Sequence, residues 1–206
     1  MQRLMPGILA MILVVVVSNI LVQHLLGQWL TWGAFTYPLA FLVTDLTNRL
    51  AGAVAARKVV VIGFVIGILC SIIGSQIQGE FGALVSLRVA IASGLAFLCA
   101  QLTDVSVFNL LRRLSWWKAP LFASFLGSCL DTVIFFTVAF AAPLSFLEPS
   151  NDVGWANEVM PLLGVGPAVP LWISLAVADW CIKIAIAVIA LTPYRAIVWR
   201  NTPRIA

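Results

Sequence analysis

The chain has 206 residues, of which 62% are hydrophobic and only 10% are charged. Its mean hydropathy of +1.07 lies far above the range of soluble globular domains, so the composition excludes that class and indicates an integral membrane protein. Several spans of about 20 residues each would use nearly the whole length. We therefore expect a single all-α, membrane-embedded domain over residues 1–206.

Long apolar runs predict a bundle of six transmembrane helices. Their ranges are 4–26, 34–56, 59–77, 83–110, 119–142 and 170–191. The apolar run from Ile8 to Val22 is long and no small-residue cleavage site follows it, so we interpret the first span as a retained helix and not a signal peptide. The four cysteines lie on different spans without metal-ligand spacing, so we expect no metal and no cofactor.

Lys and Arg residues cluster at alternate ends of the predicted spans. The basic positions are Arg3, then Arg57 and Lys58, then Arg112, Arg113 and Lys118, and finally Arg195, Arg200 and Arg204. The other loops contain no Lys or Arg and carry Glu80, Glu148, Asp152 and Glu158. Because positive loops stay in the cytoplasm, this pattern predicts that both termini are cytoplasmic. The net charge of +4 follows from this bias, so no nucleic-acid partner is expected.

Seven ionisable side chains lie inside the apolar spans: Asp45, Arg49, Arg88, Asp104, Asp131, Asp179 and Lys183. A charge at the centre of a span costs roughly 2.5–3.5 kcal/mol on insertion scales, so their number indicates a polar substrate or a charge relay and favours transport. Asp45 and Arg49 are spaced i, i+4 with the acid first, as are Asp179 and Lys183, so each pair can neutralise itself on one helix face. Alternatively, the pairs serve only insertion and packing.

Polar and aromatic side chains also follow one face of the fourth span and one face of the fifth. The fourth span carries Ser93, Phe97, Gln101, Asp104 and Phe108 at intervals of three or four, and the fifth carries Ser124, Ser128, Asp131 and Phe135. The first span adds Asn19 and Gln23. We expect these faces to enclose a pocket near the centre of the bundle.

Two other features are given structural interpretations. Arg88 lies nearly opposite Asp104 by helical phase, close to the external end, where it would snorkel or pair with Glu80. The third span has no charge, and the G-x-x-x-G spacing of Gly63 and Gly67 permits close helix approach. We therefore expect the third span to act as scaffolding.

Four segments carry a resemblance to a known family. They are the segment from Tyr37 to Leu46, the segment from Arg88 to Phe97, the segment from Gln101 to Val105, and the segment from Ser128 to Phe136. In order and spacing they resemble the queuosine precursor transporters, the YhhQ or VUT family. The resemblance implies a six-helix protein of the bacterial inner membrane that imports 7-deazaguanine precursors of queuosine, notably preQ0 and preQ1, for tRNA modification. Its motif residues fall on Asp45, Arg88, Ser93, Gln101, Asp104, Ser128, Asp131 and Thr132.

A 7-deazaguanine is planar and presents an N1 donor beside a 2-amino donor, and one carboxylate can accept both. For that edge we predict Asp131 or Asp45, with Gln101 and Asn19 orienting the ring. Phe97, Phe136 or Trp180 would stack on it. The predicted substrate set also includes Ser93, Asp104, Ser128, Thr132 and Asp179, with Arg49, Arg88 and Lys183 as charge partners. The four acids exceed these three bases by one, which permits a cationic cargo but does not decide between preQ0, preQ1 and queuine.

The energy source is left open by the sequence. No G-x-x-x-x-G-K-[ST] phosphate loop occurs. One alternative is proton-coupled uptake through Asp104 or Asp179. A second is uptake driven by a separate ATPase module, with this chain as the substrate-binding subunit. A third is facilitated diffusion, with later enzymatic trapping of the cargo. An intramembrane aspartyl enzyme needs two carboxyls in contact, and no G-x-G-D-type motif supports one. A purely structural membrane subunit would leave the charges inside the spans without a function. The sequence does not determine whether the chain forms a homo-oligomer.

Overall fold

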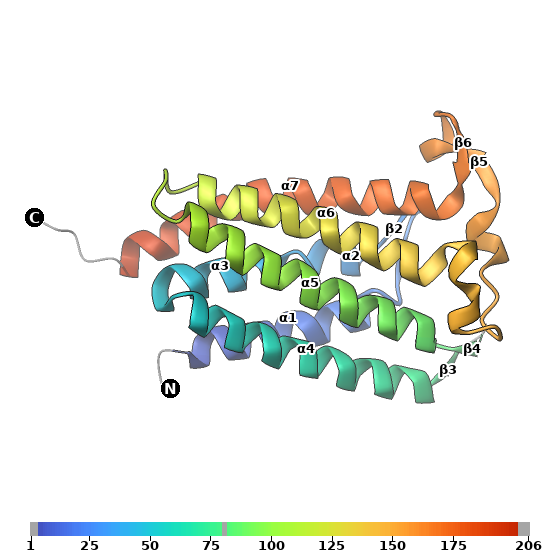
Figure 1. Ribbon diagram of the computed structural model, residues 1–206, viewed down its shortest axis with the longest axis horizontal. Coiled ribbons are helices and arrows are strands. Elements are labelled where there is room, and N and C mark those ends of the chain that lie inside the picture. The colour runs from blue at the N-terminus through green and yellow to red at the C-terminus, as the bar shows by residue number, and fades with distance from the viewer. Residues whose placement is uncertain (1–3, 80–81, 202–206) are drawn as a thin grey trace, which may run out of the picture.

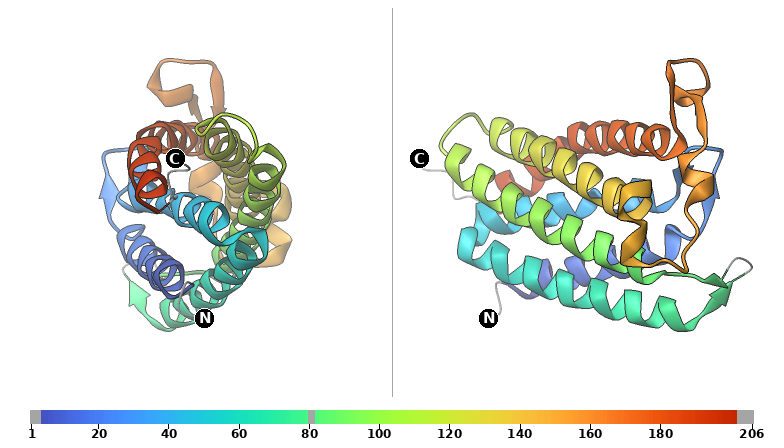
Figure 2. Two further views of the ribbon diagram at one scale, coloured as in Figure 1. Left: turned by 90° about the vertical axis from the view of Figure 1, so that its left-hand side faces the viewer. Right: turned by 45° about the vertical axis from the view of Figure 1, so that its right-hand side comes forward.

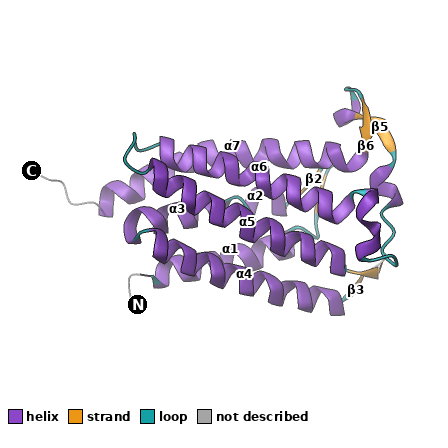
Figure 3. Cartoon of the chain, in the orientation of Figure 1, coloured by secondary structure: helices purple, strands orange, loops and turns teal. Residues whose placement is uncertain are grey.

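The computed structural model describes residues 4–79 and 82–201. Arg3, Glu80 and Arg204, which enter the predictions above, lie outside the described residues. The described chain is mostly helical, as Figure 3 shows. Its helices are α1 (Met5–Leu21), α2 (Gly33–Thr36), α3 (Leu39–Ala51), α4 (Ala53–Gln76), α5 (Leu87–Leu111), α6 (Lys118–Phe140) and α7 (Leu171–Asn201).

Short hairpins and 3₁₀ turns occupy the connections at one end of the bundle. The hairpins pair β1 (Leu25–Leu26) with β2 (Leu30–Thr31), β3 (Gln78–Gly79) with β4 (Gly82–Ala83), and β5 (Val159–Pro161) with β6 (Ala168–Pro170). The 3₁₀ turns are Ala142–Leu147, Gly154–Asn157 and Leu162–Gly164. The β5–β6 hairpin projects beyond the start of α7 (Figure 1). These connections add no separate core.

Four helices are long and apolar enough to cross a membrane by length and composition: α4, α5, α6 and α7. The helix α1 is apolar but has only 17 residues, and α3 has only 13. At 1.5 Å per residue α3 is about 20 Å long, which is shorter than the roughly 30 Å hydrocarbon core. The chain is therefore a multi-pass, helical membrane protein.

The predicted single helix over 34–56 is wrong. Helix α2 ends before Pro38, which lacks the N–H that would continue the hydrogen-bond ladder, and α3 begins after it. Gly52 then ends α3 with a φ of +89°, a conformation that a residue with a Cβ rarely adopts. Helix α4 begins at Ala53, so residues 53–56 belong to the next helix. Hydropathy missed both breaks because both flanking segments are apolar.

Other boundaries also differ from the predicted ones. The first span was predicted to reach residue 26, but α1 ends at Leu21 and residues 25–26 form β1. Because α4 begins at residue 53, Arg57 and Lys58 lie on its first turns and not in a loop between spans. Because α7 runs through Pro193 to Asn201, Arg195 and Arg200 lie on the helix and not after it. The helix ends that carry Arg57, Lys58, Arg112, Arg113, Arg195 and Arg200 still lie at one end of the bundle, where α3 meets α4, α5 meets α6 and α7 ends (Figure 1).

The short helix α3 lies inside the bundle and packs against α1, α4, α5, α6 and α7, as the end-on view in Figure 2 shows. Its buried face is polar as well as apolar, with Thr44, Asp45, Thr47 and Asn48 buried. A helix surrounded by others can keep polar groups away from lipid only if its neighbours provide partners for them. The central position of α3 therefore determines where the functional side chains meet.

Small residues bring the surrounding helices close together. A Cβ on Gly127 of α6 would lie 2.7 Å from Cε1 of Phe41 and 3.2 Å from the carbonyl oxygen of Ala100. On α4, a Cβ on Gly63 would lie 2.7 Å from Cγ of Met11, whereas one on Gly67 would meet nothing nearer than 3.8 Å. Close approach through the G-x-x-x-G spacing is therefore confirmed at Gly63 alone.

Candidate transport site

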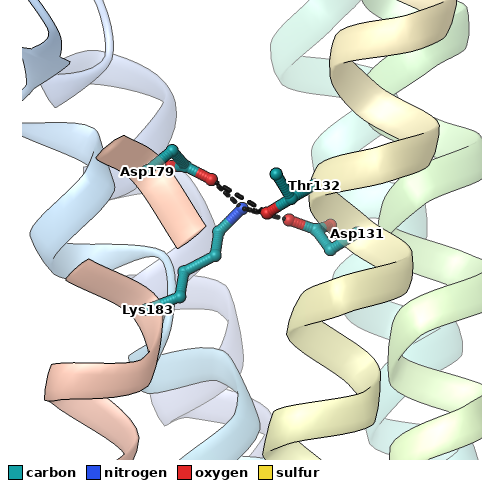
Figure 4. A network of polar contacts seen from close by, with 4 residues as sticks. All are labelled: Asp131, Thr132, Asp179 and Lys183. Carbon is teal, nitrogen blue, oxygen red and sulfur yellow. Dashed lines mark hydrogen bonds and ion pairs between the residues drawn. The ribbon is translucent and has the colours of Figure 1, made fainter. Parts of the chain in front are cut away.

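A network of four side chains joins α6 to α7 in the middle of the bundle (Figure 4). Nζ of Lys183 lies 2.6 Å from Oδ2 of Asp131 and also forms an ion pair with Asp179. The hydroxyl of Thr132 accepts from Lys183 at 3.2 Å and donates to Oδ2 of Asp179 at 3.1 Å. The side chains of Lys183 and Asp131 are each 4% exposed. We call Asp131, Thr132, Asp179 and Lys183 the Lys183 network.

The predicted pairing of Asp179 with Lys183 is confirmed, and the structure adds a second acid to it. Asp179 precedes Lys183 by four residues on α7, so one helix face holds both. Asp131 comes from α6, the helix packed alongside, and shares the same ammonium. The network therefore contains two acidic side chains and one basic side chain.

Tyr37 borders this network, and the sequence prediction gave it no role. Its ring centroid lies 5.8 Å from Nζ of Lys183, and its hydroxyl lies beside the carboxylate of Asp131. The ring also makes an edge-to-face contact with Phe97 at 6.1 Å. Tyr37 sits at the break between α2 and α3. The one available signal was its place directly before Pro38 inside an apolar stretch, because such a proline interrupts a helix.

A second acidic group lies closer to the end of the bundle that carries the basic residues. The carboxyl of Asp45 on α3 lies next to that of Asp104 on α5, and Ser124 of α6 donates to Oδ2 of Asp45 at 3.3 Å. Asp45 is 2% exposed and Asp104 is fully buried. No ion pair reaches either acid from the described residues. We call these two residues the Asp45–Asp104 pair.

The predicted pairing of Asp45 with Arg49 is wrong. Nη1 of Arg49 donates to the carbonyl oxygen of Arg112 at 2.7 Å, just beyond the last turn of α5. The final carbonyls of a helix lack intrahelical donors and carry partial negative charge, so they attract a cation. Asp45 points toward α5 and α6, where Asp104 and Ser124 lie. The i, i+4 rule considers only one helix and therefore missed these cross-helix partners.

The predicted partner of Arg88, Glu80, lies outside the described residues, but the prediction that Arg88 snorkels is wrong because its side chain is fully buried. Its Nε donates to the carbonyl oxygen of Val138 at 2.6 Å and Nη2 donates to that of Ala141 at 2.5 Å. Both acceptors lie at the end of α6, where carbonyls need donors. Glu148 accepts from the backbone N–H of Arg88 at 2.8 Å. Arg88 therefore ties α5 to the end of α6.

These two corrections change the charge balance of the interior. Since Arg49 and Arg88 both bind backbone carbonyls, Lys183 is the one membrane base that pairs with an aspartate among the described residues. Four acids, namely Asp45, Asp104, Asp131 and Asp179, then face one base, which gives an excess of three instead of one. The bundle interior is thus suited to cations or protons.

Uncharged polar groups link α3 to α5. Thr44 donates to Oε1 of Gln101 at 2.6 Å, and Asn48 donates to the carbonyl oxygen of Val105 at 3.1 Å. Nε2 of Gln101 and the hydroxyl of Ser128 are buried and have no hydrogen-bond partner in the described chain. A buried donor without a partner is costly, so these two groups are available to a ligand or to water.

The remaining predicted site residues lie apart from the Lys183 network. Asn19 and Ser93 donate to the carbonyls of Val15 and Val89 one turn earlier on their own helices, at 2.9 and 2.8 Å. Together with Phe97 and Tyr37 they line an outer cavity between α1, α4 and α5. The helix α4, expected to be scaffolding, also lines it through Phe64, Gly67, Ile68 and Ser71.

The predicted stacking residues differ in their surroundings. Phe136 packs against Phe135 and Phe140, with ring centroids 5.1 and 5.9 Å apart. Trp180 packs edge-to-face on Phe125, and its Nε1 has no partner among the described residues. Neither ring lines the outer cavity, whereas Phe97 does. Phe97 and Tyr37 are therefore the rings best placed to contact a ligand in it.

An inner cavity lies between α3, α6 and α7. Its wall includes Asp45, Ser124, Lys183 and Tyr194. The space between these side chains admits about one water molecule, and the outer cavity admits only slightly more. A bicyclic ligand fits neither cavity in this conformation, so helix movement must precede its entry.

Comparison with known proteins decides what kind of protein this is. The family described as "Putative vitamin uptake transporter" matches residues 31–198. The chain belongs to this family. It is 35% identical to the queuosine precursor transporter of Escherichia coli (strain K12) over 197 residues, covering 88% of this chain and 80% of the relative.

Two further relatives agree with that assignment. A probable queuosine precursor transporter of Haemophilus influenzae is 36% identical over 82% of this chain and 68% of its own length. One of Bacillus subtilis (strain 168) is 29% identical over 83% of this chain and 72% of its own length. No solved structure matches the chain significantly. The family is one of transporters and not of enzymes, so the contact between Asp45 and Asp104 is to be explained within transport.

Proposed function

We propose that this protein imports queuosine precursors, 7-deazaguanines such as preQ0 and preQ1, across the bacterial inner membrane. The observation that carries the proposal is the 35% identity to the Escherichia coli queuosine precursor transporter over 88% of this chain. The polar centre of the bundle supports it. An ammonium and four carboxyls are costly inside a membrane protein, and such groups mark the path of a polar substrate or an ion.

The membrane topology follows as part of the proposal. Six crossings are made by α1, the broken element α2–α3, α4, α5, α6 and α7, with both termini in the cytoplasm. The gathering of Arg57, Lys58, Arg112, Arg113 and Arg195 at one end of the bundle supports this orientation. A broken helix at the centre is typical of transporter binding sites, since irregular backbone is tolerated in a membrane where it lines a cavity.

The Lys183 network has the chemistry that the guanine-like edge of the cargo needs. That edge combines two neighbouring donors with one carbonyl acceptor, and the network combines carboxylates with an ammonium. In the proposed complex, Asp131 accepts hydrogen bonds from N1 and the 2-amino group of the cargo. Lys183 retains its ion pair with Asp179 and donates a hydrogen bond to the carbonyl of the cargo. Tyr37, whose ring already lies near Lys183, provides a flat surface for the bicycle.

Restoration of queuosine in tRNA tests the proposal. The gene is expressed in bacterial cells that make no queuosine precursor and lack their own importer. The cells receive nanomolar preQ0 or preQ1, and queuosine is measured by the mobility shift of tRNA. We expect the gene to restore queuosine and Asp131→Asn to abolish the restoration. Asp152→Asn, on the exposed loop after α6, is the matched control and should restore it fully. Well-expressed protein that restores nothing would overturn the proposed cargo.

A further inference from the structure

We propose that the Asp45–Asp104 pair is a proton-binding site, separate from the Lys183 network, and that its proton enters the cell with the substrate. The proton site itself is argued from the geometry of the pair. Its coupling to uptake rests on the proposed function.

The contacts of the pair require a proton. With both carboxyls ionised, Oδ1 of Asp45 and both oxygens of Asp104 have no hydrogen-bond donor among the described residues. Two buried carboxylates in contact repel one another, and both are shielded from bulk water. One proton on either carboxyl removes the repulsion and supplies the missing donor, as in proton-sharing carboxyl dyads.

No cation among the neighbouring groups replaces that proton. The hydroxyl of Ser124 on α6 donates a hydrogen bond to the pair. Tyr194 and Lys183 of α7 line the inner cavity beside Asp45. The ammonium of Lys183 is held by Asp131 and Asp179. On α3 itself, Arg49 donates to the carbonyl of Arg112 and leaves Asp45 unpaired. The neutral neighbours are therefore a hydroxyl and a phenol.

The inner cavity gives the pair a route toward the proposed cytoplasmic side. Asp45 and Ser124 line it together with Tyr194, which is 1% exposed and whose hydroxyl has no partner among the described residues. A phenol both donates and accepts, so with one water molecule it can pass a proton along the cavity. Because Lys183 lines the same cavity, a proton that leaves Asp45 changes the charge next to the substrate network. This shared wall couples the two sites.

The proton site can be tested without any substrate. In purified full-length protein at neutral pH, infrared spectroscopy should show the carbonyl stretch of a protonated carboxyl. We expect the double variant Asp45→Asn/Asp104→Asn to remove this band, because the pair then has no carboxyl that can hold the proton. Asp152→Asn should keep the band. A wild-type spectrum without the band would overturn the proton site, whatever the transport results.

Coupling is tested in proteoliposomes with preQ0, which is uncharged. If one proton accompanies each molecule, an inward gradient of one pH unit should concentrate preQ0 up to about tenfold. Asp104→Asn should still equilibrate preQ0 but reach the same concentration on both sides. Accumulation driven by a sodium gradient, or pH-driven accumulation that survives Asp104→Asn, would overturn the coupling. A wild type that shows the infrared band but moves no preQ0 would contradict the proposed function and leave the proton site in place.

Discussion

The bundle contains two clusters of buried aspartates that differ in how their charge is balanced. In the Lys183 network, Asp131 and Asp179 share an ammonium and a threonine hydroxyl. In the Asp45–Asp104 pair, no cation from the described residues is present, and Ser124 donates the one hydrogen bond found among those residues. The same residue type is thus held in one cluster by a cation and in the other by a proton. We infer that the Lys183 network recognises the substrate and that the Asp45–Asp104 pair binds the proton that is transported with it.

Removal of the shared ammonium should have the largest effect. Lys183→Met leaves the buried carboxylate of Asp131 without a cation and removes the ion pair of Asp179, and the loss of a buried ion-pair partner costs about 3–5 kcal/mol of stability. We expect a strongly lowered unfolding temperature in detergent and no preQ0 uptake. Lys58→Met, on the exposed face of α4, is the matched control and should change neither. An unfolding temperature as high as that of the control would show that the network is not held by its cation.

Neutralising one acid of the network should have the next largest effect. Asp131→Asn leaves Lys183 with Asp179 alone, and the loss of one charge-assisted contact costs about 1–3 kcal/mol. Asp179→Asn should cost less stability, since the side chain of Asp179 is 15% exposed and water can replace part of its contact. Thermal unfolding of both variants gives the order. The reverse order would mean that Asp179 is the main partner of Lys183.

Removal of the tyrosine hydroxyl should have a smaller effect. Tyr37→Phe keeps the ring near Lys183 and its contact with Phe97 but removes the hydroxyl beside Asp131, at a cost of about 1 kcal/mol. We expect weaker preQ0 binding by roughly tenfold or less, as titration calorimetry would measure it. Tyr194→Phe removes the other tyrosine hydroxyl and should leave binding unchanged. Equal losses in both variants would argue against a substrate role for Tyr37.

The smallest effect on stability is expected at the pair. Asp104→Asn replaces a proton-sharing carboxyl by a neutral amide of the same shape, so its free energy of unfolding should change by less than about 1 kcal/mol. This contrasts with Asp131→Asn, which breaks an ion pair. The comparison is made by unfolding both variants at neutral pH. A loss at Asp104 as large as that at Asp131 would indicate an ionised pair with an unrecognised cation.

The sequence predicted the helical membrane class and the long helices well, because apolar runs report directly on the surface that faces lipid. It missed the break at Pro38 and the turn at Gly52, since hydropathy does not report backbone conformation. A stretch of about 20 apolar residues was interpreted as one span, although it contains the short central helix α3. The helix that organises the site was therefore the one predicted least well.

Within the site, i, i+4 spacing predicted side-chain partners correctly where both partners lie on one helix and incorrectly where they lie on different helices. The pairing of Asp179 with Lys183 follows from i, i+4 spacing, but the same rule paired Asp45 with Arg49 wrongly. The contact of Asp45 with Asp104 depends on how α3 packs against α5, and periodicity along a single helix does not report that packing. Arg88 was assigned to the surface for the same reason, although its acceptors lie at the end of α6.

Equilibrium binding of preQ0 to purified protein tests the division between the two clusters most directly. Wild type, Asp131→Asn and Asp104→Asn are compared at one pH, each after its unfolding temperature has been measured. The account predicts that Asp131→Asn loses binding while Asp104→Asn retains it. Binding that survives Asp131→Asn and disappears with Asp104→Asn would contradict the account, because the substrate would then be recognised by the pair.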